Sequence, residues 1–244
     1  MKKLGIQLFS AEDALDRDFR GAVKAIAEMG YTSVEGAIYD NVTVDEFASS
    51  VKDAGLSVSG IHCDLSRLDN EFDKTIAYFN TLDCHDFIIP WSTWEDEDYI
   101  NMANGINKYQ PILKKEGIDL HFHNHQYEFL DRIARGPHKC IPFEHLRRET
   151  DVLFQIDMYW VAVADKDPLK VIAENKDRIK FVHMKDGLLG SEGGEAKVLG
   201  CGQAPVIAVR DLALELGIEM IVENECREPD GLTAAAECYK FLTK

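Results

Sequence analysis

Long apolar runs are missing from this 244-residue chain. None approaches the roughly 20 residues that a helix needs to span a bilayer. The apolar run near the N-terminus is too short for a secretory signal and is soon broken by acidic residues. Paired cysteines are missing as well, because the six cysteines lie far apart with no CxxC motif, which argues against a disulfide scaffold or a zinc ribbon. We therefore expect a cytoplasmic protein with buried free thiols.

Basic residues are fewer than acidic residues in this chain. The chain has 27 lysines and arginines against 43 acidic residues, a formal net charge of −16. A field of this sign repels phosphate backbones and anionic membrane surfaces, so we expect neither nucleic acid nor a membrane as partner. It also disfavours a strongly anionic substrate unless a metal or local cations reverse the sign at the site. A small molecule is the expected partner, and a homo-oligomer is left open.

A regular alternation of strands and helices organises the chain. Eight short apolar or alternating runs are typical of strands; seven are followed by a convincing helix and the fifth by a weak one. The predicted strands cover residues 4–9, 33–36, 56–62, 87–90, the run starting at 118, 153–157, 179–185 and 219–223. Such alternation implies a parallel sheet, and eight units in about 250 residues is the size of a (β/α)8 barrel.

The fold prediction is one TIM-barrel domain over residues 1–244. The alternative is a doubly wound open sheet, which usually carries a glycine-rich phosphate turn after its first strand. Here that turn is FSAED, which contains no glycine. The loosest stretch is residues 190–202, a candidate for a mobile loop over the site.

Metal-capable side chains gather in the stretch IDLHFHNHQYEF, residues 118–129. Alternate residues of a strand share a face, so His121, His123 and His125 would line one side. Glu128 has the opposite parity and joins them only if the strand ends first and the chain turns. A buried charge or imidazole is costly without partners, so this cluster indicates a site. A solvated strand end with chance histidines is the competing interpretation.

Titratable residues also end other predicted strands. Active sites of (β/α)8 barrels lie at the carboxyl ends of the strands. Asp157, His183 and Glu223 each follow an apolar run, an expensive place unless the group is paired or metal-bound. Two carboxylates and an imidazole suit a borderline divalent cation. We expect Mn²⁺ first, with Zn²⁺, Co²⁺ and Mg²⁺ as alternatives, although Mg²⁺ prefers oxygen ligands. Ordinary strand-end groups bonded to loops are the competing interpretation.

Seven characteristic strings run along nearly the whole chain: GIQLFS, MGYTSVEGA, GLSVSGIH, HFHNHQYEF, QIDMYWVAVA, RIKFVHMKDG and IVENE. In these strings the sequence resembles the sugar phosphate isomerase/epimerase family, the xylose-isomerase-like barrels. HNHxxEF followed by IDxYWV and HxKD is specific to one branch of that family. The resemblance implies a divalent metal held by Glu, Asp, His and Glu from strands five to eight. Asp157, His183 and Glu223 match the last three.

The first ligand departs from the family pattern. Many relatives carry a glutamate inside strand five, with a second acid six residues later. If Glu128 matches that second acid, Phe122 occupies the ligand position. Either Glu128 folds back onto the metal, or His123 or His125 replaces the missing carboxylate, or water does. Glu128 is the preferred assignment and His125 the second.

The implied ligand set predicts Lewis-acid chemistry on a sugar. A divalent cation chelated by a carbonyl and its neighbouring hydroxyl acidifies the α-carbon hydrogen and stabilises the resulting enediolate. The acid/base candidates are Glu223 and Glu128, with histidines as helpers because a metal-bound carboxylate is a weak base. Those helpers are His62 and His123. Substrate contacts are expected from Lys185, Glu35, Trp91 and Trp160.

A metal-dependent isomerase or epimerase of a sugar or keto-sugar is the first functional hypothesis. The alternative is a lyase of the same fold, a dehydratase or a keto-glycoside-cleaving enzyme, because the same enediolate can expel a β-substituent. A non-catalytic sugar-binding barrel is the third. An endonuclease needs several metals and a basic cleft, which the net charge of −16 disfavours. No phosphate-binding motif stands out, so we expect an unphosphorylated substrate.

Overall fold

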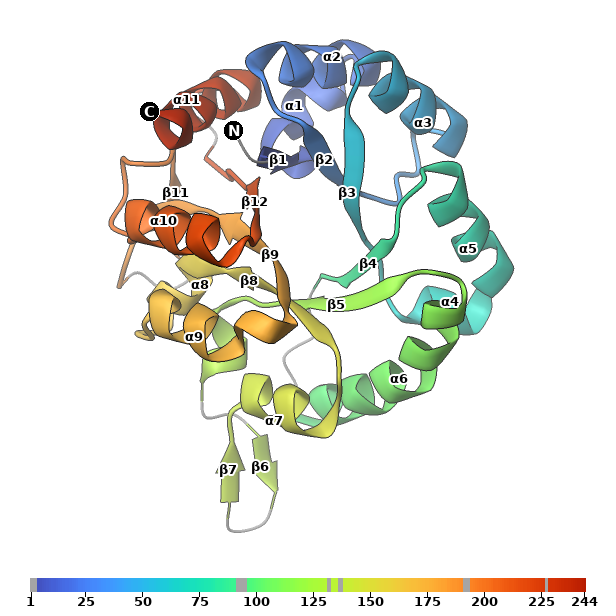
Figure 1. Ribbon diagram of the computed structural model, residues 1–244, viewed down its shortest axis with the longest axis vertical. Helices are drawn as coiled ribbons and strands as arrows, with labels where there is room; N and C mark the ends of the chain where they lie inside the picture. The colour runs from blue at the N-terminus through green and yellow to red at the C-terminus, as the bar shows by residue number, and fades with distance from the viewer. Residues whose placement is uncertain (1–3, 91–95, 131–132, 136–137, 191–193, 227) are drawn as a thin grey trace.

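Eight parallel strands close into a barrel in the order β1-β12-β9-β8-β5-β4-β3-β2, and β1 pairs with β2 to complete the ring (Figure 1). The computed structural model describes residues 4–90, 96–130, 133–135, 138–190, 194–226 and 228–244. The barrel strands are β1 Leu4–Gln7, β2 Ser33–Ala37, β3 Ser57–His62, β4 Asp86–Ile89, β5 Asp119–His123, β8 Leu153–Asp157, β9 Ile179–Met184 and β12 Glu219–Val222. The predicted (β/α)8 barrel is confirmed, and the closed ring excludes the open-sheet alternative.

Helices surround the barrel (Figure 1). They are α1 Glu12–Leu15, α2 Phe19–Met29, α3 Val44–Asp53, α4 Ser66–Asn70, α5 Phe72–Thr81, α6 Asp96–Lys115, α7 Pro142–Glu149, α8 Met158–Val163, α9 Pro168–Asn175, α10 Val206–Leu216 and α11 Gly231–Thr243. The Thr43 hydroxyl caps α3 by accepting a hydrogen bond from the Glu46 N–H. Gly30 and Gly217 end α2 and α10 with positive φ. Within the described residues, no helix combines the length and apolar character of a membrane span.

Two antiparallel strand pairs lie outside the barrel and were not predicted. The strands β6 Ile133–Arg135 and β7 His138–Cys140 form a hairpin that projects beyond α7 (Figure 1). The strands β10 Asp186–Leu188 and β11 Glu195–Lys197 pair just after β9. Three-residue strands carry too little periodicity to be recognised in a sequence.

The segment expected as a mobile loop is organised around the Asp186 carboxylate. Its two oxygens accept hydrogen bonds from four backbone N–H groups, those of Gly187, Gly200, Gly202 and Ala204. These bonds, together with the pairing of β11 with β10, hold the later part of the segment against the chain that leaves β9. Residues 191–193 lie outside the described residues.

The side chains of β5 alternate as its sequence predicts. Phe122 joins the hydrophobic core, whereas His121 and His123 are buried in two polar clusters. The strand ends at His123, so this residue lies at the carboxyl end of the barrel.

Candidate metal centre

Four ligand-capable side chains converge at the carboxyl end of the barrel. Each comes from a different one of the neighbouring strands β5, β8, β9 and β12, or from the residue directly after it. All four are buried, and one donor atom from each lies within 4.8 Å of the others. This group, called here the metal group, consists of His123, Asp157, His183 and Glu223. The structure therefore brings together the three strand-end residues expected as ligands, and their role as ligands stays a prediction.

The hydrogen bonding of Asp157 leaves one carboxylate oxygen available for a cation. Its Oδ1 accepts hydrogen bonds from the backbone N–H groups of Tyr159 and Trp160, at 2.9 and 3.1 Å. Its Oδ2 is buried without a hydrogen-bond partner, and Lys185 Nζ lies 4.0 Å from it. Burial raises the pKa of Asp157, and the charge of Glu223 adds to the rise. A buried carboxylate oxygen without a partner is costly, and a cation would satisfy it.

His183 has a carboxylate at each ring nitrogen. Its Nε2 lies 2.7 Å from Glu35 Oε1, and its Nδ1 lies 3.2 Å from Glu223 Oε2. Burial opposes the imidazolium, but the two carboxylates outweigh it and raise the pKa of His183 to about 10. A metal ligand must be a neutral imidazole, so binding by His183 requires the loss of a proton.

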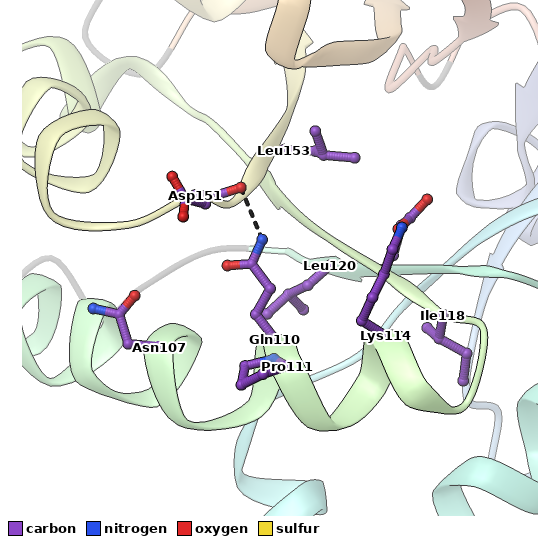
Figure 2. Close-up of a pocket in the computed structure, with 9 residues that line it drawn as sticks. Asn107, Gln110, Pro111, Lys114, Ile118, Leu120, Asp151 and Leu153 are labelled. Carbon is purple, nitrogen blue, oxygen red and sulfur yellow. Dashed lines mark hydrogen bonds and ion pairs between the residues drawn. The ribbon is translucent and has the colours of Figure 1, made fainter.

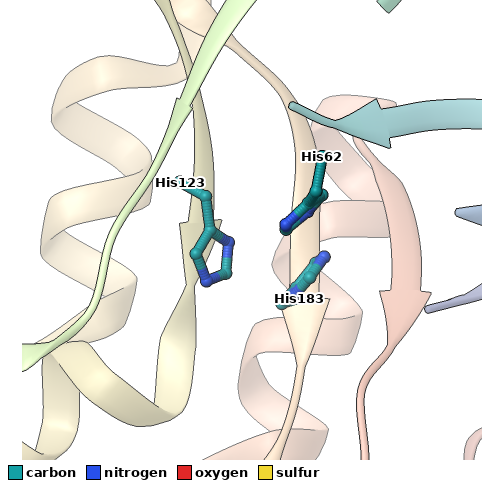
Figure 3. A group of neighbouring side chains, drawn as sticks. All are labelled: His62, His123 and His183. Atoms are coloured by element: carbon teal, nitrogen blue, oxygen red, sulfur yellow. The ribbon is translucent and has the colours of Figure 1, made fainter. Parts of the chain in front are cut away.

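Three histidine rings meet at the metal group, those of its members His123 and His183 and that of His62 beside them (Figure 3). The ring centroid of His123 lies 4.7 Å from that of His183, and the ring of His62 stacks on His183 at 5.9 Å. The His62 Nε2 lies 2.8 Å from Glu35 Oε1. His62 is the half-buried member of the three. Burial and the neighbouring histidines lower the pKa of His123 well below its ordinary value. His123 is therefore neutral, as a metal ligand must be.

Gln155 connects these histidines and was not predicted. Its Oε1 lies 2.9 Å from His123 Nδ1, and its Nε2 donates to Glu35 Oε2. Glu35, expected to contact substrate, thus has partners inside the protein at both carboxylate oxygens. Gln155 lies two residues before Asp157 on β8, so strand parity was the signal that could have revealed it.

Glu128, the preferred first ligand, lies outside the metal group. The chain does turn after β5, in a 3-10 turn over Gln126–Phe129, but the turn points the carboxylate elsewhere. Glu128 Oε1 accepts a hydrogen bond from the Tyr99 hydroxyl, and Oε2 accepts one from the His125 N–H, both at 2.7 Å. Among the described residues, the metal group therefore contains His123 from β5 and neither Glu128 nor His125. Which residue from β5 binds a metal stays a prediction.

His125 and Trp160 face each other with unmet polar atoms. Their ring centroids are 5.7 Å apart. The Nδ1 of His125 and the Nε1 of Trp160 are buried without hydrogen-bond partners. Burial lowers the pKa of His125 to about 4, and the charge of Lys185 contributes. A neutral imidazole and an indole N–H suit the hydroxyl groups of a ligand. Trp91, also expected to contact substrate, lies outside the described residues.

Lys185 is almost fully buried among acids. Its Nζ lies 2.8 Å from Glu225 Oε2 and 3.2 Å from Glu223 Oε2, and 4.7 Å from the ring centroid of Trp160. Burial opposes both charges, but the pairing raises the pKa of Lys185 and lowers that of Glu223. Contact between Lys185 and a substrate oxygen stays a prediction, and Glu225 is a partner that the sequence did not reveal.

Comparison with known proteins agrees with the barrel. A family model described as the xylose isomerase-like TIM barrel matches residues 23–244. An inosose dehydratase from Halalkalibacterium halodurans is 27% identical over 94 residues, which cover 37% of this chain and 29% of that enzyme. The match therefore spans less than a third of the relative's length.

Solved structures are similar over the whole chain. A sugar phosphate isomerase/epimerase from Parabacteroides distasonis has a TM-score of 0.84 at 23% identity, with 100% of this chain and 98% of that chain covered. A D-psicose 3-epimerase from Clostridium cellulolyticum has a TM-score of 0.71 at 14% identity, with 99% and 98% covered. At these identities the likeness shows the fold alone.

Proposed function

Because the chain belongs to the xylose isomerase-like TIM barrel family, we propose that it is a divalent-metal-dependent isomerase or epimerase of a sugar or keto-sugar. The observation that carries this proposal is the buried metal group, in which Asp157 Oδ2 has no hydrogen-bond partner. We assign all four side chains of the group as ligands. A divalent cation bound there supplies a Lewis acid that polarises a carbonyl and acidifies the neighbouring C–H.

The metal assignment follows from the donor atoms. Two imidazoles and two carboxylates form a mixed nitrogen and oxygen set, which suits Mn²⁺, Zn²⁺ or Co²⁺ better than Mg²⁺. We propose Mn²⁺ as the native ion.

Proton transfer is assigned to one carboxylate of the group and to a histidine beside it. Burial opposes ionisation of Glu223, but the charge of Lys185 helps to lower its pKa, so we assign Glu223 the removal of the proton beside the carbonyl. His62 is less enclosed than His183, and its hydrogen bonds to Glu35 and Gln155 hold its ring in place. We assign it the return of the proton.

Hydrogen bonds from the chain orient the substrate in this proposal. His125 and Trp160 offer buried polar atoms that have no partner inside the protein. Lys185 neutralises part of the acidic charge and aims its ammonium between Glu223 and Glu225.

Solvent-exchange measurements test the reaction. The Mn²⁺-loaded protein is incubated in D2O with a panel of ketoses and keto-sugars. Deuterium should enter C2 or C3 of the recovered sugar without loss of mass, and a chelator should stop the exchange. His183→Ala should abolish both metal retention and exchange, whereas His85→Ala, a change in an exposed residue, should alter neither. If elemental analysis finds no divalent metal and the chelator leaves exchange intact, the proposal fails.

A lyase is the second candidate because the match to an inosose dehydratase favours it. The first step, removal of a proton beside a carbonyl, is the same; the β-substituent then leaves instead of the proton returning. In the same experiment a lyase would release water or an aglycone, detected as loss of mass.

A further inference from the structure

Each histidine of the metal group has one ring nitrogen that contacts a polar side chain outside the group. His123 Nδ1 lies 2.9 Å from Gln155 Oε1, and His183 Nε2 lies 2.7 Å from Glu35 Oε1. A neutral imidazole has one N–H and one lone pair, so the nitrogen that donates a hydrogen bond cannot also bind a metal. The partners of these two rings therefore decide which nitrogen of each is available to a cation.

Glu35 accepts hydrogen bonds at both of its oxygens. It is fully buried, and its Oε1 accepts a hydrogen bond from Gln7 Nε2 at 3.0 Å. The orientation of the Gln7 amide is fixed, because its Oε1 accepts a hydrogen bond from the Phe9 N–H at 3.1 Å. A carboxylate has no proton to donate, so the Nε2 of His183 carries the hydrogen and its Nδ1 has the lone pair. That Nδ1 lies on the side of the metal group, 3.2 Å from Glu223 Oε2.

The same carboxylate sets the orientation of the Gln155 amide. The oxygen and nitrogen of an amide are assigned from their partners, and Gln155 Nε2 donates to Glu35 Oε2. The reverse orientation would place the amide oxygen against a carboxylate oxygen, two acceptors with no proton between them. Gln155 Oε1 must then face His123, so the proton lies on His123 Nδ1 and the lone pair on Nε2.

The positions of the rings agree with this assignment (Figure 3). One nitrogen of the His123 ring faces His62, and the other points away from it. The nitrogen that faces His62 is Nδ1, because His62 Nε2 lies 3.2 Å from the same Gln155 Oε1 that contacts His123 Nδ1. Both histidines of the metal group thus turn their protonated nitrogen toward Glu35 or Gln155.

We propose that Glu35 and Gln155 are positioning residues that select the ligand nitrogens, Nε2 of His123 and Nδ1 of His183. They act through the two rings and do not bind the ion themselves. This inference rests on the proposed function and deepens it, because it needs the ion that we assign to the metal group. It also means that Glu35 on β2 controls His123 on β5 through the amide of Gln155 on β8.

The proton positions are tested first in the metal-free, full-length protein. Long-range proton–nitrogen NMR spectra of protein labelled with nitrogen-15 at histidine distinguish the two tautomers of each ring, and a His123→Asn variant assigns the signals of His123. Its proton should lie on Nδ1. His121 is an internal reference, because Asp86 Oδ1 lies 2.8 Å from its Nε2 and should hold the proton there. A proton on Nε2 of His123 in wild type overturns the inference.

Glu35→Gln tests the control of His123 through Gln155. Because Gln7 Nε2 still needs an acceptor, the new amide should keep its oxygen there and turn its NH2 toward Gln155. The Gln155 amide should then turn over and move the His123 proton to Nε2. Affinity for Zn²⁺, a diamagnetic probe, should fall about 10- to 100-fold, the effect of changing an outer partner of a metal-binding histidine. An unchanged tautomer of His123 in this variant overturns the inference.

Gln155→Met removes the acceptor of His123 altogether. The His123 ring should lose its single tautomer, and calorimetric Zn²⁺ affinity should fall about 10- to 100-fold. The matched control is Gln110→Met, in a cavity of about 540 Å³ at the opposite end of the barrel, where Gln110 Nε2 donates to the Asp151 carbonyl (Figure 2). The control also loses an amide hydrogen bond, but its Zn²⁺ affinity should stay within about twofold of wild type. Equal losses in the two variants overturn the inference.

Metal binding separates failure of this inference from failure of the proposed function. If wild-type protein binds no divalent metal, the proposed function fails and the positioning role fails with it. If wild type binds Zn²⁺ and both Glu35→Gln and Gln155→Met bind it equally tightly, the inference alone fails.

Discussion

Two polar clusters lie inside the barrel, and each takes a histidine from β5. In the lower cluster, His121 Nε2 lies 2.8 Å from Asp86 Oδ1, and Lys180 Nζ donates to both oxygens of Asp86 at 2.6 and 2.7 Å. In the metal group, Asp157 Oδ2 has no hydrogen-bond partner. Both carboxylate oxygens of Asp86 therefore have hydrogen-bond partners. In the metal group, one carboxylate oxygen has none, and two acids lie close together.

The contrast shows that burial of titratable residues does not by itself mark a site. The histidine and the acid of the lower cluster are as buried as the metal group, although Lys180 is exposed. What differs is whether the protein completes the hydrogen bonds of its own carboxylates. His121 Nδ1 of the lower cluster also lacks a hydrogen-bond partner, so the contrast concerns the carboxylates alone. A paired carboxylate stabilises the fold, and an unpaired carboxylate oxygen can accept a ligand. Substitutions at matched positions in the two clusters test whether metal binding depends on one cluster and stability on the other.

The largest expected effect is on metal binding by Asp157→Asn. The change removes the charge of a proposed ligand, so Mn²⁺ affinity should fall at least about 100-fold, more than the loss of an outer partner causes. Calorimetric titration measures the affinity, and Asp86→Asn in the lower cluster should bind Mn²⁺ like wild type. Equal affinities in Asp157→Asn and wild type would refute the ligand assignment.

Asp86→Ala should have its main effect on stability. It leaves His121 buried without its acceptor and Lys180 without its carboxylate, so the free energy of unfolding should fall by about 2 to 4 kcal/mol. Urea denaturation measures the loss. Mn²⁺ affinity should stay within about twofold, a free-energy difference of less than 1 kcal/mol. A strong loss of metal binding would mean that the two clusters act as one.

The pH dependence of stability should also report the lower cluster. Burial opposes ionisation of Asp86, but hydrogen bonds and charges from His121 and Lys180 outweigh it and lower the pKa of Asp86 below its ordinary value. Its contribution to stability is therefore complete above the ordinary value of about 4 and is lost as the pH falls through the folded value. Urea denaturation from about pH 5 to about pH 2 should show a steeper fall for wild type than for Asp86→Ala. Parallel curves would contradict this role.

Glu128→Gln should have the smallest effect. The change weakens the hydrogen bonds to Tyr99 and to the His125 N–H, so the free energy of unfolding should fall by about 1 to 2 kcal/mol. Because Glu128 lies outside the metal group, Mn²⁺ affinity should stay within about twofold, or less than 1 kcal/mol. Loss of Mn²⁺ from this variant would restore Glu128 as the ligand from β5.

Local patterns predict most of the barrel. The strand over residues 153–157 was predicted with the bounds of β8, because an apolar run and a polar end mark it. Strand β1 ends two residues earlier than predicted, at Gln7, whose Oε1 accepts a hydrogen bond from the Phe9 N–H and starts a 3-10 turn. Side-chain capping by glutamine is not readable from strand periodicity, so this boundary was missed.

The candidate site was predicted less completely than the fold. Strand-end positions led to the prediction of Asp157, His183 and Glu223, which the structure brings together and whose role as ligands stays a prediction. The preference for Glu128 depended on the direction of a turn, and the Glu128 carboxylate accepts a hydrogen bond from the Tyr99 hydroxyl on α6, 29 residues away. Long-range contacts of this kind have no local signature in one sequence.

By itself, the sequence determined the order of strands and helices and the residue types at the strand ends, because both follow from local periodicity and turn chemistry. Only the tertiary structure decided which of those residues meet. Closure of the ring sets Glu35 of β2 against His183 of β9, 148 residues apart, at 2.7 Å. It also decides which buried atoms stay unpaired, such as Asp157 Oδ2 and the amide of Asn224. Those unmet bonds depend on distances across the barrel, which local sequence patterns do not set.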